Sequence, residues 1–166
     1  MTTQPDKETT PLDSNAIWQA WQSLDNAASA QMRRISEPDE LKGVPAFYRL
    51  VQPLGWQSDD MRVKRALLRI IFCLTAGKNA LKSTDKEISL GAGLAGSKKI
   101  NEQRVFQLIR SDAPKDMVHL RRLIIHAEPT VNWPRFVETL YYWNKRAKQN
   151  LLEDFVIASA PTSDKK

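Results

Sequence analysis

The sequence has few of the residues from which metal sites and nucleophilic catalysts are usually built. Its 166 residues include two histidines and one cysteine, so an internal disulfide and a CxxC metal knuckle are both excluded. Cys73 lies in an apolar run over 70–74, where we expect a small buried hydrophobic side chain. His119 and His126 stand seven residues apart, which is not the i, i+4 spacing of a helical metal site. We therefore predict no catalytic residues, no metal ligands and no cofactor.

Long hydrophobic runs are also missing. No apolar stretch approaches the ~20 residues that cross a bilayer, so no membrane partner is expected. The N-terminal residues, with the sequence TTQPDKETTPLDSN, lack the hydrophobic segment of a signal peptide. With 42% hydrophobic and 27% charged residues, the composition is that of an ordinary globular core with a well-solvated surface. We expect a soluble, cytoplasmic protein.

Strand-like alternation is absent as well, and apolar residues recur at helical spacing through most of the chain. The broadest apolar helix is expected over about 59–76, and one last long helix is expected from Trp133 to about Ala158. Ser36 is expected to cap a helix that has Pro38 in its first turn. The pattern predicts an all-α fold, a helical bundle in one domain or in two small lobes that share a core.

The segment 91–96 reads GAGLAG and so contains a literal GxGxxG. In a dinucleotide site these glycines follow a buried strand and begin a helix whose N-terminus meets pyrophosphate. Here the preceding residues, DKEISL, do not form such a strand, and no βαβ pattern surrounds the match. We interpret the segment as a tightly packed short helix that ends at Gly96.

The charge of the chain is more informative than its motifs. The net charge is +6 and the pI is near 9.5, which favours anionic partners. Between residues 98 and 122 seven basic residues face only three acids, on segments with helical spacing. Such a surface is typical of proteins that bind nucleic acid. The basic residues are Lys98, Lys99, Arg104, Arg110, Lys115, Arg121 and Arg122, and the acids are Glu102, Asp112 and Asp116.

On helical wheels these arginines fall on different faces of their helices. Arg110 and Arg122 point outward and Arg104 lies at a flank, whereas Arg121 falls within the apolar arc. Arg121 is therefore expected to make a structural ion pair, with an acid of a neighbouring helix as the candidate partner. The same wheels place Phe106 and Ile125 inward. Tyr142, close to Lys145 and Arg146 in the sequence, is the one aromatic residue retained as a candidate surface contact.

The chain resembles the CasB family, the small subunit of the type I-E CRISPR surveillance complex called Cascade. The resemblance extends over about residues 15–157. It is carried by RRISEPDEL at 33–41, PAFYRLVQPLGW at 45–56, FCLTAGKN at 72–79, ISLG at 88–91, INEQRVFQLIR at 100–110, MVHLRRL at 117–123, HAEP at 126–129 and LLEDFV at 151–156.

The resemblance implies an all-helical fold of two small lobes. We place them at 13–96 and 97–158, between tails over 1–12 and 159–166 that we expect to be disordered. It also implies a non-catalytic subunit for antiviral defence that contacts crRNA, target DNA with its displaced non-target strand, the backbone and large subunits, and a second copy of itself. The nucleic-acid-binding positions it implies are Arg34, Arg104, Arg110, Arg122, Lys145 and Arg146.

Two other functions remain open at this stage. The basic helices could belong to a stand-alone helical regulator that binds DNA or RNA, with Arg104, Gln107 and Arg110 as base-reading side chains. A small enzyme would have to use the glycine segment over 91–96 or the two histidines. Indifference to DNA sequence would argue against the regulator, and a nucleotide-induced thermal shift would favour the enzyme.

Overall fold

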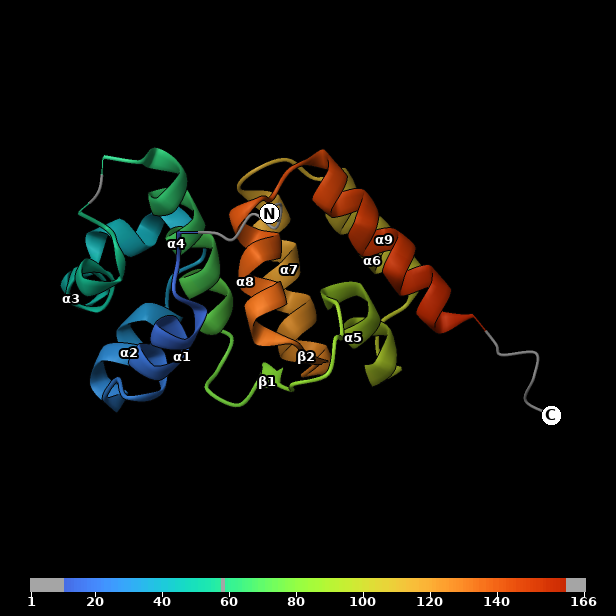
Figure 1. Cartoon of the computed structure of the whole chain (residues 1–166), viewed down its shortest axis with the longest axis horizontal. Helices are drawn as coiled ribbons and strands as arrows, with labels where there is room; N and C mark the ends of the chain where they lie inside the picture. The colour runs from blue at the N-terminus through green and yellow to red at the C-terminus, as the bar shows by residue number, and fades with distance from the viewer. Residues whose placement is uncertain (1–10, 58, 161–166) are drawn as a thin grey trace, which may run out of the picture.

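The computed structural model of the chain describes residues 11–57 and 59–160, and it confirms the all-α fold (Figure 1). In the first half of the chain the elements are α1 (Ser14–Gln22), α2 (Asn26–Arg33), the 3-10 helix η1 (Pro38–Gly43), α3 (Pro45–Val51), the 3-10 helix η2 (Gln52–Leu54) and α4 (Met61–Leu74). In the second half they are β1 (Lys82–Ser83), α5 (Leu90–Ser97), α6 (Glu102–Arg110), α7 (Lys115–Ala127), β2 (Thr130–Val131), α8 (Trp133–Tyr141) and α9 (Lys145–Ser159).

Short polar side chains set most of the helix starts. Each accepts a backbone N–H from the first turn and so satisfies a donor that has no partner within the helix. Asn132 does so directly before Trp133, where the sequence predicted a helix start, and Asn101 does so at the start of α6. Asp25 caps α2, a helix that the apolar pattern did not predict. In the described residues these caps are Asp13, Asp25, Asp60, Ser89, Asn101, Asn132 and Asn144.

The start expected at Ser36 differs from the prediction. The element that follows is the 3-10 helix η1, and its N-cap residue, Glu37, makes no side-chain capping bond. The bond runs the other way, because the Ser36 N–H donates to Oε1 of Glu40 at 2.7 Å. The acid therefore satisfies the backbone donor and the Ser36 hydroxyl does not act as a cap.

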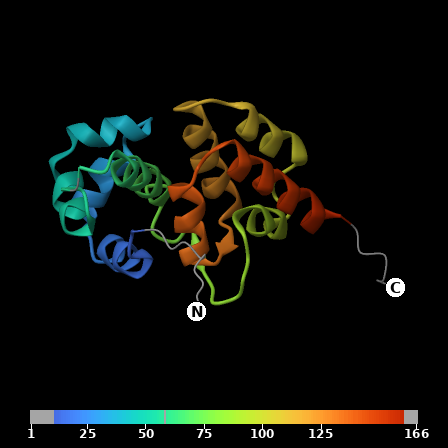
Figure 2. The ribbon, with the colours of Figure 1, turned by 45° about the horizontal axis from the view of Figure 1, so that its top comes forward.

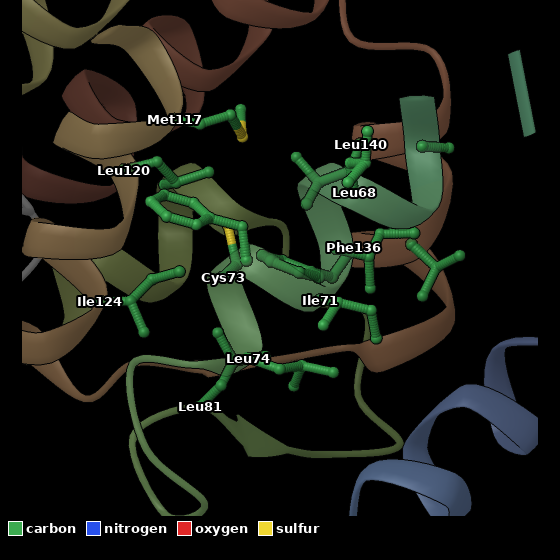
Figure 3. Packing of buried hydrophobic residues seen from close by; sticks show 14 of the residues in the cluster. Leu68, Ile71, Cys73, Leu74, Leu81, Met117, Leu120, Ile124, Phe136 and Leu140 are labelled. Carbon is green, nitrogen blue, oxygen red and sulfur yellow. The ribbon is translucent and has the colours of Figure 1, made fainter. Parts of the chain in front are cut away.

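The centre of the core is α4, which packs on α7 through one side and on α8 through another. In Figure 3, Leu68 and Ile71 of α4 lie towards Leu140 and Phe136 of α8, and Met117, Leu120 and Ile124 of α7 lie on the other side of the helix. The buried apolar residues form one continuous cluster that runs from Leu12 to Phe155. The N-terminal and C-terminal helices thus share a core, since the broad apolar surface of α4 serves both sides.

The C-terminal helices form the second half of the molecule. α9 lies between α5 and α6, as the turned view shows (Figure 2). α5 makes its most extensive packing with α9, so it belongs with the C-terminal helices. The division of the chain into lobes at residue 96 stays a prediction, and the 75–89 connection leads from α4 to α5. This connection includes β1, which pairs in parallel with β2.

The single long helix expected from Trp133 to Ala158 is two helices, α8 and α9, with a break at 142–144. Asn144 has an extended backbone and its side chain accepts the Ala147 N–H, which starts a new helix. The apolar periodicity continues through the break, so a wheel could not detect it. The break turns α9 away from α8 and towards α5 and α6.

The glycine segment over 91–96 is a packed helix, as the sequence suggested. A Cβ atom on Gly91 would lie 2.9 Å from the backbone nitrogen of Phe155, and it would also collide with the Leu151 carbonyl. A Cβ atom on Gly93 would lie 2.6 Å from the Thr130 carbonyl oxygen. The first two glycines therefore permit close contact of α5 with α9 and β2.

Most of the expected tails lie outside the described residues, namely 1–10 and 161–166. Within the N-terminal stretch, Leu12 is described and is buried in the core. At the other end, α9 continues through Ser159. The structure therefore extends beyond both expected boundaries of the folded region, residues 13 and 158. No helix in the described part of the chain is both long enough and apolar enough to span a membrane.

Candidate nucleic-acid interface

Helix α6 carries two of the six predicted binding residues. Val105 and Leu108 are fully buried and fix the helix on α7 and α9. Arg110 is exposed and Arg104 is half-buried, as the wheel predicted. Both arginines line the same shallow depression. Phe106 lies in it as well and is 44% exposed, so its predicted inward position was wrong.

Helix α7 carries two consecutive arginines, Arg121, which makes structural contacts, and Arg122, which is exposed. Arg121 is half-buried: its Nη1 donates to the Thr75 hydroxyl at 2.7 Å and its Nη2 to the Ile35 carbonyl at 2.8 Å. Its partners are thus neutral oxygens and not the acid that the sequence suggested. Desolvation lowers the pKa of Arg121, and the guanidinium lies over the ring of Phe72. Ile125, predicted inward on this helix, is 50% exposed.

The contact of Arg121 with the Ile35 carbonyl also positions two predicted binding residues. Arg34 directly precedes Ile35 and is exposed at the C-cap of α2. Arg122 directly follows Arg121 and is exposed on α7. The hydrogen bond across this junction therefore ties together the two segments that carry Arg34 and Arg122, although they are far apart in the sequence.

The remaining two predicted residues, Lys145 and Arg146, lie exposed in the first turn of α9. This turn is held beside the end of α6, because Nζ of Lys148 donates to the Ser111 carbonyl at 2.7 Å. Lys148 also forms a buried ion pair with Asp116, with 3.1 Å between Nζ and Oδ2. Arg146 lines a cavity of about 290 Å³ that includes Arg135 and the start of α5. The six predicted residues thus lie in three places: Arg104 and Arg110 on α6, Lys145 and Arg146 beside the end of α6, and Arg34 and Arg122 on the two segments that Arg121 ties together.

Two arginines of α4, Arg62 and Arg69, make structural contacts. Nη1 of Arg69 donates to the Leu140 carbonyl at 2.9 Å, and burial lowers its pKa. The guanidinium of Arg62 lies 5.3 Å from the ring centre of Tyr141 and 5.7 Å from that of Tyr142. These residues fasten α4 to α8. Tyr142, the candidate surface aromatic, is half-buried in this group.

Sequence reasoning did not find a cleft of about 580 Å³ between η1, α4 and α7. Lys64 and Arg65 of α4 lie at it, and Lys64 Nζ is 5.6 Å from the ring centre of Trp56. The walls combine cations with the half-buried rings of Trp56 and Trp143. A periodic pattern within one helix gives no signal for a cleft whose sides come from three elements.

The residues that an enzyme would need are scattered or enclosed. His119 is half-buried and His126 is exposed, on the same helix α7. Cys73 is buried, and desolvation raises the pKa of its thiol well above the ordinary value. Within 11–57 and 59–160, no group of three or more His, Cys, Asp or Glu residues is placed to hold a metal ion.

The fold and its surface define a basic, all-helical protein that exposes arginines on several helices around one shared core. The chain belongs to the family of CRISPR-associated protein Cse2, whose pattern matches residues 28–155. The CRISPR system Cascade subunit CasB of Escherichia coli strain K12 is 54% identical over 154 residues, which make up 89% of this chain and 95% of that protein.

Solved structures agree with this assignment. A chain in the crystal structure of E. coli Cascade bound to a PAM-containing double-stranded DNA target superposes with a TM-score of 0.86 at 57% identity. The match covers 89% of this chain and 97% of that one. A Cse2-family protein from Thermus thermophilus has a TM-score of 0.64 at 15% identity, covering 89% of this chain and 99% of that one. At that identity the likeness is one of fold alone.

Proposed function

We propose that this chain is the small subunit of a type I-E Cascade surveillance complex. In this role it contacts the backbones of the crRNA and the target DNA, and it stabilises the R-loop and its displaced non-target strand in antiviral defence. Its partners are the backbone and large subunits of the complex and a second copy of itself. The cytoplasm is the compartment that this role requires.

One observation carries the proposal: the likeness to the E. coli subunit runs over nearly the full length of both chains. Shared identity of 54% over such a span includes surface positions as well as the core. It therefore supports a shared place in an assembly and not only a shared fold. The backbone of this chain also closely resembles that of the chain solved within Cascade on its DNA target.

The proposed binding residues are Arg34, Arg104, Arg110, Arg122, Lys145 and Arg146. The physical basis is charge: guanidinium groups suit phosphate oxygens, and contacts to the backbone carry no sequence information. Formation of an R-loop exchanges one duplex for another at nearly balanced free energy. A few phosphate contacts on rigid helices are therefore enough to shift that balance towards the open loop.

We further propose that the subunit is not catalytic. The proposal is supported by the enclosed thiol of Cys73 and by two histidines that lie apart from any acid cluster in the described residues. In this role the protein acts through binding alone, and cleavage of the target belongs to another component.

A binding experiment tests the phosphate contacts. Isolated protein should bind single- or double-stranded nucleic acid weakly and with steep salt dependence, because each neutralised phosphate adds roughly 0.7 to 0.9 to the log–log salt slope. Fluorescence anisotropy between about 50 and 200 mM salt measures the slope. A slope near zero would contradict the proposal, as would tight binding that salt does not weaken.

Reconstitution tests the assembly. Co-expression with the other Cascade subunits should incorporate the chain into the complex, and omission of the chain should weaken R-loop formation on a matched duplex. A chain that stays outside the complex would contradict the proposed role. Preference of the isolated protein for one DNA sequence over unrelated ones would instead favour the stand-alone regulator, which reads base edges.

A further inference from the structure

Phe106 is an exposed aromatic ring in the middle of a basic helix. The fully buried Val105 and Leu108 already hold α6 against its neighbours, so the ring is not needed to anchor the helix. A single exposed apolar side chain is ordinary on a protein surface. The surroundings of Phe106 are what distinguish it.

The ring lies in an open depression of about 620 Å³ on α6. The described residues that line this depression include two arginines and two glutamines, and none of them is acidic. The ring is thus the apolar part of a positively charged, amide-rich surface. The lining residues are Asn101, Gln103, Arg104, Phe106, Gln107, Arg110 and Ser111.

Arg110 is held beside the ring. One helical turn separates it from Phe106, and its guanidinium carbon lies 5.3 Å from the ring centre. This contact is a cation–π interaction, which orders the guanidinium next to the aromatic surface. The helix therefore presents a flat apolar ring and an ordered positive charge together, while Arg104 adds a second cation at the same depression.

These two features match the two parts of a nucleotide. A base stacks on an aromatic ring whatever its sequence, and the phosphate beside it binds a guanidinium. A duplex cannot use the ring, since its bases are stacked on one another inside the helix. The occupant that fits is therefore a single strand, in which the bases are free to leave the stack.

We propose that Phe106 and Arg110 form a base-stacking platform for a single-stranded nucleic acid. The proposal rests on the proposed function and deepens it: the surface would hold an unpaired strand by its bases as well as by its phosphates. The platform discriminates single strands from duplexes and remains indifferent to sequence.

The test compares two fluorescent oligonucleotides of equal length, oligothymidine and a strand of abasic sites, which carry the same phosphates. Full-length wild-type protein should bind the oligothymidine more tightly. Phe106→Ala should remove most of that preference, a loss of roughly five- to hundredfold in affinity for oligothymidine, while the abasic strand is bound as before. The salt slope should remain unchanged, because no cation is lost.

Two control variants separate stacking from other effects. Phe106→Trp should keep the preference for bases, since indole also stacks. Ile125→Ala removes a comparably exposed side chain from the neighbouring helix α7 and should leave both affinities unchanged. Thermal melts of all three variants check that each is folded.

The outcomes are distinct. Equal, salt-dependent binding of both strands by the wild type overturns the platform and leaves the phosphate contacts standing. Salt-independent binding, or none, overturns the phosphate contacts and the platform together. A folded Phe106→Ala protein that keeps its preference for bases but no longer enters the complex shows that the ring contacts a protein subunit, which also overturns the platform.

Discussion

The guanidinium carbon of Arg121 lies 4.2 Å from the centre of the Phe72 ring, in the contact between α7 and α4. The same guanidinium donates to the Thr75 hydroxyl and to the Ile35 carbonyl. One side chain thereby joins three segments: the end of α4, the stretch that follows α2, and α7. Arg121 therefore links the C-terminal helix α7 to the N-terminal helices α2 and α4.

Arg121→Ala should therefore destabilise the protein. It removes two hydrogen bonds from a charged donor, each contributing about 1.5–3 kcal/mol, and leaves the Ile35 carbonyl without that donor. We expect a loss of about 3 kcal/mol in the free energy of unfolding, measured by urea denaturation. The matched control is Arg122→Ala on the same helix, which removes an exposed charge and should leave the unfolding midpoint nearly unchanged. Equal midpoints for the two variants would contradict the structural role of Arg121.

The exposed arginines should show the opposite behaviour. Alanine at Arg34, Arg110 or Arg122 should hardly change the melting temperature, because exposed charges contribute little to stability. The three changes combined should weaken R-loop stabilisation by the assembled complex, since each removes a phosphate contact that nothing replaces. A gel shift of target duplex with the reconstituted complex measures the effect. If a normally folded triple variant holds the R-loop like the wild type, these arginines are a solvated surface and the site assignment is wrong.

The glycine segment of α5 allows a third prediction. Gly91→Ala should cost about 3 kcal/mol, because the new methyl group collides with the backbone of α9 at Leu151 and Phe155. Gly96→Ala is the matched control: nothing lies within 4 Å of a Cβ there, and alanine should stabilise by about 0.5 kcal/mol. Thermal melts compare the two, and similar losses in both would contradict the packing of α5 on α9.

The buried thiol of Cys73 predicts a dependence on pH. Burial raises its pKa in the folded protein above the ordinary value of 9.0. The folded state therefore keeps the proton when the unfolded chain has lost it. The stability contributed by this group is fully present below about pH 9 and is lost as pH rises above it, by about 1.4 kcal/mol per pH unit.

Cys73→Ala supplies the control for this prediction, since lysines and tyrosines also titrate in the alkaline range. Urea midpoints of the wild type and of Cys73→Ala, taken at about pH 8 and about pH 10, isolate the cysteine contribution. The difference between the two proteins should shift with pH in favour of the variant. A difference that stays constant would show that the thiol ionises in the folded protein.

The sequence predicted the fold class and much of its detail because periodicity and caps are local signals. The helix start at Asn132, the wide apolar surface of α4 and the packed glycine helix were all accessible in this way. The break before α9 could not be predicted. Asn144 caps a new helix there, but the apolar residues keep their helical spacing on both sides of it. The 3-10 form of η1 was missed for a related reason, since a proline and nearby acids are equally common in α-helices.

For the candidate site, the wheels correctly separated Arg110 and Arg122 from Arg121. They failed at Phe106 and Ile125, which belong to the edges of their apolar arcs and are 44% and 50% exposed. The partners of Arg121 were also beyond reach, since Thr75 and the Ile35 carbonyl meet it only through tertiary packing. One sequence signal was available: Phe106 stands between two arginines on a helix whose core face is complete without it.

The hydrogen bond from Arg121 to the Ile35 carbonyl has a geometric consequence for any strand that crosses the α2–α7 junction. It holds the backbone of the segment after α2 in place against α7, so the positions that carry Arg34 and Arg122 do not move independently. Phosphate contacts from these two positions therefore require no ordering of the protein backbone on binding. Affinity that a mobile loop would lose to ordering is retained here by the fold itself.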